Sequence, residues 1–301
     1  KIELARQAEM QREESKSTAD NSFDNLPDSA RTARLESSFG VFAAAMTGAD
    51  DVTVLENDLI ELHISNKGGR ISYARLKDYT TYDNKPVVLF EGKEASLDFT
   101  LVTATNRVLN TAELFFTPVK TQDPNQLVMR VNAGEGSSLD FIYTIKPDDY
   151  MVQFDIKGTG LNGVLAPSTT ALDMVWRQKI RQQEQGIKYE NRYTALYYKF
   201  LADGVEQLSE SKSEDKKVSG RLKWIAYKDK FFSTVIIADE GFESATFDPK
   251  MVEADGIVKE FKTTTAVPFD LRGNEATTFR YFFGPNSYPL LKSYDKGIAS
   301  D

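Results

Sequence analysis

The sequence predicts an all-β protein, built from many short antiparallel strands as a sandwich or barrel. Three observations support this fold class. Apolar and polar residues alternate along short segments, those segments are rich in β-branched and aromatic residues, and turn-forming residues separate them. A repeating alternation of strands and helices, which would indicate a parallel sheet, is not evident.

The first 50 residues differ from the rest and predict a tether. They contain few aromatic residues, and residues 1–14 are rich in Glu, Gln, Arg and Ala, which favour helix. A polar segment with Pro27 follows, which is typical of a linker. We expect a solvated helix, then a linker, with packing onto the body beginning around Phe39–Met46. The globular domain would comprise residues 51–301.

From Val52 onward the hydrophobic period is two. Ile60, Leu62 and Ile64 would face the core of one such strand, and Glu61 and His63 would face the other way. The same reasoning predicts strands at Val87–Phe90, Leu97–Thr103, Leu127–Val131, Leu139–Ile145, Val152–Ile156, Leu172–Trp176, Thr194–Phe200, Phe231–Ala238 and Thr277–Phe283. Many short strands at such spacing favour a sandwich.

Few segments of the body favour helix. Arg177–Gln185 is a polar, Gln-rich run that could form a short helix or an excursion. Pro289–Lys296 has proline near its first turn and Gly297 after its predicted end, which predicts a C-terminal helix. Its apolar residues at helical spacing are Leu290, Leu291 and Tyr294.

Composition excludes several classes of function. The net charge is −8 and the pI about 5.0, which disfavours a nucleic-acid partner because such proteins need basic residues against phosphate. The chain has no cysteine, so disulfides and thiolate metal sites are excluded. No apolar run approaches the roughly 18 residues of a membrane span. Because the chain begins with Lys1, we expect it to be part of a longer protein, with any targeting or membrane segment outside it.

Two motifs of apparent chemistry have a plainer structural interpretation. Gly158–Gly163 matches the dinucleotide pattern G-x-G-x-x-G, but that pattern works only where a helix begins, and Pro167 and another strand follow instead. We interpret it as a turn. His63 is the chain's one histidine, and it lies on the polar face of a strand, away from any cluster of glutamates. It is the one candidate for imidazole acid–base chemistry.

Other singled-out residues also suit structural roles. Gly68 and Gly69 are expected to adopt positive φ in a tight hairpin turn. Trp176 and Trp224 lie within or beside predicted strands, where they would serve as core or as cleft-lining aromatics. No residues point to a metal or a cofactor, and none is predicted.

Three segments carry a resemblance to a known family. They are Val54–Ile71, the run Lys223–Ile236 (with Trp-Ile-Ala-Tyr-Lys-Asp-Lys-Phe-Phe at its start), and Tyr281–Tyr288 (with Phe-Phe-Gly-Pro), leading into Leu290 and Leu291. In this order and spacing they resemble the large periplasmic domain of the YidC family of bacterial membrane protein insertases. The resemblance covers about residues 52–298.

The resemblance implies a twisted β-supersandwich like that of galactose mutarotases. It implies a periplasmic domain of an inner-membrane protein in a Gram-negative cell, lying between two membrane helices. Residues 1–50 would descend from the first, and the helix containing Leu290, Leu291 and Tyr294 would couple the domain to the membrane. The partners implied are accessory subunits of the Sec translocon and nascent membrane proteins.

The same resemblance leaves rival functions open. A mutarotase-like enzyme would need a convergent acid–base set, typically a glutamate with histidines, and this chain has a single histidine. A carbohydrate-binding module would need exposed aromatic residues, for which Trp176 and Trp224 are candidates. We therefore expect a non-enzymatic docking or peptide-interaction domain, with the carbohydrate-binding and mutarotase-like functions as alternatives.

Overall fold

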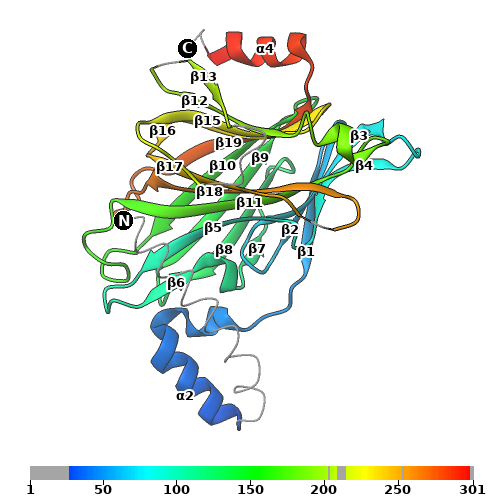
Figure 1. The fold of residues 1–301 in the computed structure, drawn as a ribbon. Helices are drawn as coiled ribbons and strands as arrows, with labels where there is room; N and C mark the ends of the chain where they lie inside the picture. The colour runs from blue at the N-terminus through cyan, green and yellow to red at the C-terminus, as the bar shows by residue number, and fades with distance from the viewer. Residues whose placement is uncertain (1–26, 203, 209–214, 253, 299–301) are drawn as a thin grey trace.

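The computed structural model describes residues 27–202, 204–208, 215–252 and 254–298, and the predicted helix at residues 1–14 lies outside them. Nineteen strands form three sheets in the described chain, with antiparallel pairing throughout the named strands (Figure 1). The predicted all-β antiparallel sandwich is confirmed.

The smallest sheet has four strands in the order β1-β2-β3-β4. Its strands are β1 (Val52–Glu56), β2 (Ile60–Ser65), β3 (Ile71–Thr80) and β4 (Pro86–Glu91). In β2 the apolar residues Ile60, Leu62 and Ile64 are fully buried, as their alternation predicted. Gly69, in the turn before β3, has φ of 58°, and a Cβ there would lie 2.8 Å from the Phe116 ring.

The largest sheet has nine strands in the order β13-β12-β15-β16-β19-β10-β9-β8-β7. Its strands are β7 (Thr117–Val119), β8 (Gln126–Asn132), β9 (Ser138–Ile145), β10 (Met151–Thr159), β12 (Ala195–Phe200), β13 (Val205–Gln207), β15 (Leu222–Lys228), β16 (Phe232–Phe242) and β19 (Thr277–Pro285). The sheet extends from edge to edge of the domain and supplies one face of the core.

The third sheet has six strands in the order β14-β17-β18-β11-β5-β6. Its strands are β5 (Ala95–Val102), β6 (Val108–Asn110), β11 (Ala171–Arg181), β14 (Lys216–Val218), β17 (Ala245–Lys250) and β18 (Ile257–Pro268). The prediction of a helix or excursion at Arg177–Gln185 is wrong as far as Arg181. There β11 stays extended because β18 and β5 pair with it, and the side chain of Gln178 is buried.

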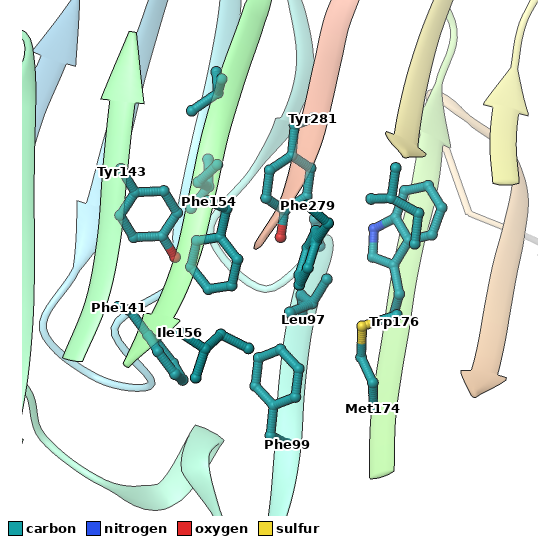
Figure 2. Close-up of a cluster of buried hydrophobic side chains, with 14 of the residues drawn as sticks. Leu97, Phe99, Phe141, Tyr143, Phe154, Ile156, Met174, Trp176, Phe279 and Tyr281 are labelled. Carbon is teal, nitrogen blue, oxygen red and sulfur yellow. The ribbon is translucent and has the colours of Figure 1, made fainter. Parts of the chain in front are cut away.

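Aromatic side chains fill the space between the two larger sheets (Figure 2). Phe99 on β5 packs edge-on against Phe141 of β9, with ring centroids 5.6 Å apart. Phe154 on β10 contacts the same Phe141 at 5.4 Å. Such rings bury large apolar areas and prefer these tilted geometries. The interior of the sandwich is therefore occupied by its own side chains.

Two helical segments precede the sheets. Helix α2 (Asp28–Phe39), which the sequence analysis assigned in part to a linker, has no buried residue. The 3₁₀ helix η1 (Gly40–Met46) buries Phe42 completely, and the Ala45 carbonyl accepts a hydrogen bond of 2.7 Å from the N–H of Phe115. The predicted first contact with the body around Phe39–Met46 is confirmed.

Three further short helical segments complete the description. They are η2 (Thr111–Glu113), α3 (Ile187–Glu190) and α4 (Tyr288–Ile298). The predicted C-terminal helix is confirmed as α4, although it includes Gly297 and does not end before it. Helix α4 lies across one end of the sandwich, and α2 lies at the opposite end (Figure 1).

Candidate functional site

Helix α4 is fixed to the domain by one side of its surface. Leu290 and Tyr294 pack against the hydrophobic core, and Leu291 is 39% exposed. The Tyr294 hydroxyl donates to Oδ1 of Asp149 at 2.6 Å and accepts from the N–H of Tyr150 at 3.2 Å. The structure thus separates the three predicted coupling residues into two that anchor the helix and one that faces outward.

Burial raises the pKa of Tyr294, and the hydrogen bond to Asp149 raises it further. The hydroxyl therefore keeps its proton and remains the donor in that bond. Phe282 packs edge-on against the same ring, with centroids 5.7 Å apart. Tyr294 therefore holds α4 to the sandwich through polar and aromatic contacts together.

A cavity of about 220 Å³ lies beside α4, on the nine-stranded sheet. Ser293 and Tyr294 line it from the helix, and Lys146, Asp149 and Arg280 contribute charged groups from the sheet side. Arg280 also forms an ion pair with Asp239. The cavity is smaller than the roughly 300–1,000 Å³ pockets that enclose drug-sized ligands. Its size and mixed lining suit a single side chain of a partner.

The lone histidine lies in a polar cluster on the outer face of the four-stranded sheet. His63 Nε2 is 2.9 Å from Glu61 Oε1, and Arg75 donates to the other carboxylate oxygen at 3.1 Å. The Tyr73 ring stacks on the imidazole with centroids 4.3 Å apart. Glu61 and His63 lie on the same face of β2, as the alternation predicted, because residues two apart share one face of a strand.

Glu61 is the shared hydrogen-bond partner of His63 and Arg75 in this cluster. The hydrogen bond from His63 is the main reason that the pKa of Glu61 is lowered, and the charges of His63 and Arg75 lower it further. Sugar epimerisation needs an acid and a base that each reach the substrate. Here the two groups bond directly to each other.

The two tryptophans occupy different environments. Trp176 is 2% exposed and stacks on Tyr227 with centroids 3.6 Å apart, inside the sandwich (Figure 2). Trp224 is partly buried on β15, where it pairs with Lys199 and Ile237. Trp176 is therefore a core residue, and Trp224 is the one of the pair with an accessible surface.

The turn between β15 and β16 holds a buried carboxylate that the sequence analysis did not single out. Oδ1 of Asp229 accepts the N–H groups of Phe231 and Phe232 at 2.7 and 2.6 Å. Burial raises the pKa of Asp229 to about 7, and the nearby charge of Glu190 also raises it. Glu190, fully buried on α3, has a raised pKa for the same principal reason. The sequence pattern available for this turn was an aspartate followed, one residue later, by two aromatic residues. That pattern does not indicate that the carboxylate is buried.

Gly158 and Thr159 end strand β10, and residues 160–170 form turns and no helix, so the predicted turn begins at Gly160. Within the described ranges, no three histidine, aspartate or glutamate side chains gather as a metal site would require. None of the described helices combines the length and the apolar character that crossing a membrane demands.

The fold defines an antiparallel supersandwich of the galactose-mutarotase type. A galactose mutarotase-related enzyme from Lactobacillus acidophilus matches with a TM-score of 0.52 and 9% sequence identity, covering 79% of this chain and 99% of that one. A galactose mutarotase-like protein from Lactobacillus casei matches equally, with coverage of 77% and 100%. At such low identity the likeness concerns the fold alone.

The family follows from the sequence. Residues 52–300 match the family model described as the YidC periplasmic domain, and the chain belongs to that family. A membrane protein insertase YidC from Parabacteroides distasonis is 62% identical over 302 residues, covering 100% of this chain and 48% of the relative. The one from Azobacteroides pseudotrichonymphae is 43% identical over 258 residues, covering 86% and 42%. The chain spans about half the length of these relatives, and the family places it in the periplasm.

Proposed function

We propose that this chain is the periplasmic accessory domain of a membrane protein insertase, tethered to the inner membrane. The observation that carries the proposal is the match of residues 52–300 to the periplasmic-domain family. The domain offers a docking or peptide-interaction surface during insertion. In this arrangement residues 1–50 form the tether from a preceding membrane helix, and residues 51–301 form the folded domain.

The partners we propose are nascent membrane proteins and accessory subunits of the Sec translocon. Relatives named as membrane protein insertases support the first, since such a protein must meet its substrate. The closed core supports a role for surfaces and edges of the sheets in these contacts, because aromatic side chains fill the sandwich interior.

Site-specific crosslinking in an insertase–translocon preparation tests this function. A photoreactive residue at Ser293, which lines the cavity beside α4, is expected to capture nascent chains or a translocon subunit. A matched probe at Lys157, exposed on β10, serves as the control position. Equal, background-level yields from both sites and from a scan of the remaining surface would exclude the docking role.

We further propose that the domain has no catalysis of its own. The direct hydrogen bond between His63 and Glu61 supports this. Epimerisation needs an acid and a base that each contact the sugar, whereas these two groups contact each other. NMR saturation transfer between the anomers of an aldose tests it. Acceleration by the wild-type chain that is lost in His63→Ala would establish the mutarotase-like alternative instead.

The carbohydrate-binding alternative now depends on Trp224, because Trp176 is buried in the core. Glycan-array binding that disappears in Trp224→Ala and survives in Lys157→Ala would favour that module over the docking domain.

We propose that α4 couples the domain to the membrane. The N–H of Leu291 donates to the Ser287 carbonyl at 2.9 Å, so Leu291→Pro removes a bond of the first helical turn. In the full-length insertase, Leu291→Pro should impair insertion, while Leu291→Gln, which keeps the helix, should impair it less. Equal tolerance of both, and of a Gly/Ser replacement of residues 209–214, which precede strand β14, would contradict the coupling.

A further inference from the structure

Exposed aromatic rings and cations lie on α3 and the residues after it, on the β15–β16 turn and on the start of α4, and contacts join these segments. The side chain of Lys230 lies over the rings of Tyr189 and Phe231, with its Nζ 4.8 and 4.5 Å from their centroids. The Tyr193 ring packs edge-on against Tyr189 at 5.1 Å. The exposed fractions of these three rings are between 42% and 46%. Three segments distant in sequence thus contribute to one surface.

The patch continues into α4 through backbone contact. The N–H of Asn286 donates to the carbonyl of Phe231 at 2.6 Å, and Tyr288, two residues further on, is 71% exposed. Nζ of Lys292 lies 5.5 Å from the centroid of the Tyr288 ring. We call these six residues the aromatic–basic patch. Its members are Tyr189, Tyr193, Lys230, Phe231, Tyr288 and Lys292.

Charge on this surface is opposite in sign to that of the whole chain. The net charge of the chain is −8, yet Lys188 and Arg192 are also exposed beside the patch. The acidic residues interleaved with these bases, Glu190 and Asp229, are 0% and 5% exposed. Burial raises the pKa of Asp229 to about 7, which reduces its negative charge near neutral pH, and burial also raises the pKa of Glu190. The exposed surface is therefore locally basic.

The patch is built on a fixed scaffold. The side-chain amide of Asn286 donates to the carbonyl of Asp229 at 3.1 Å, which holds the start of α4 against the β15–β16 turn. The ammonium group of Lys259 donates to the carbonyls of Asn191 and Thr194 at 3.2 and 2.6 Å, just after α3. Such anchoring lowers the entropy lost when the surface binds.

We propose that the aromatic–basic patch contacts the headgroup layer of a bilayer containing anionic phospholipids. Tyrosine rings beside lysines suit that layer, since each ring has an apolar body and a polar tip and each lysine can meet a phosphate. A protein partner is less well matched, because lysine is depleted in protein–protein interfaces. The inference rests on the proposed function, in which α4 leads toward the membrane, and adds a second point of contact.

Vesicle co-sedimentation of the 301-residue chain tests the proposal without any insertion reaction. Binding is expected to vesicles of phosphatidylcholine with phosphatidylglycerol, and to weaken at high salt and without the anionic lipid. Removing two cations with Lys230→Gln and Lys292→Gln should weaken binding about 30-fold, at about fivefold per charge near an anionic surface. Phe231→Ser with Tyr288→Ser should weaken binding at both salt concentrations.

The controls show whether weaker vesicle binding comes from loss of the patch, from loss of positive charge elsewhere on the surface, or from unfolding. Lys120→Gln with Lys157→Gln removes the same charge from exposed positions on β10 and just after β7, and should leave binding within twofold. Lys188→Gln with Arg192→Gln, which removes two exposed cations beside the patch, should also weaken binding and replaces the first variant if that one unfolds.

Equal weakening by the control pair, or no binding of the wild-type chain to anionic vesicles, overturns the proposal and favours a protein partner for this surface. Either result leaves the docking function intact, because crosslinking to nascent chains measures that function separately.

Discussion

The buried carboxyl of Asp229 should make the stability of the domain fall as pH rises. Asp229→Asn tests this, because the amide oxygen can still accept the N–H groups of Phe231 and Phe232 while the side chain stays neutral. The pKa of Asp229 rises from an ordinary value of 3.8 to about 7 in the fold, mainly through burial. The folded state therefore binds the proton more tightly than the unfolded state does.

The sign and size follow from proton linkage. Between pH 4 and pH 7 the folded protein holds more protons at this site, so its free energy of unfolding decreases as pH rises. The interval from 3.8 to about 7, at about 1.4 kcal/mol per pH unit, corresponds to about 4 kcal/mol. Asp229→Asn should match the wild type near pH 4 and be more stable by up to about 4 kcal/mol at pH 8.

Urea denaturation followed by tryptophan fluorescence across this pH range measures the difference. Other carboxyl groups titrate in both proteins, so the quantity to compare is variant minus wild type at each pH. Asp58→Asn, at an exposed carboxylate, is the matched control for the loss of an aspartate side chain. A difference for Asp229→Asn that does not change with pH would refute the reasoning.

Three further predictions concern stability. Tyr294→Phe removes the bond to Asp149, so amide hydrogen exchange in α4 should become faster by about tenfold, equivalent to roughly 1–2 kcal/mol, with little change in the sheets. Tyr227→Phe removes a buried hydroxyl that lies 3.1 Å from the Trp176 carbonyl oxygen and 2.7 Å from Oγ1 of Thr263, and it should lower the free energy of unfolding by about 1–3 kcal/mol in urea titrations. Gly273→Ala places a Cβ 2.2 Å from the Gly158 carbonyl oxygen at a φ of 74°, so it should lower the melting temperature by several degrees; a melting temperature equal to wild type would contradict the clash.

Strands were predictable where one face of a sheet is buried. The alternation of Val152, Phe154 and Ile156 in β10 reports directly on a half-buried strand, and all three are fully buried. The alternation of apolar and polar residues gave a wrong prediction at Arg177–Gln185, because the strand there consists largely of long polar side chains. Pairing of β11 with strands on both sides decides its conformation, and that pairing is a long-range property.

The candidate site was predictable only in its local parts. The spacing of Leu290, Leu291 and Tyr294 predicted a helix, but which of them would be exposed depends on where the sheet lies beneath it. The contact of Lys230 with the ring of Tyr189 could not be foreseen from periodicity. It arises because the topology brings α3 next to the β15–β16 turn.

The placement of α2 and α4 at opposite ends of the sandwich sets a geometric requirement (Figure 1). If both ends of the domain's chain attach to one bilayer on the α4 side, the polypeptide that enters through α2 must first span the full height of the sandwich. An extended chain covers at most about 3.5 Å per residue, so a long, sparsely packed leader is a necessity of that architecture. Shortening it would pull the far end of the domain down and tilt the sheets relative to the membrane plane.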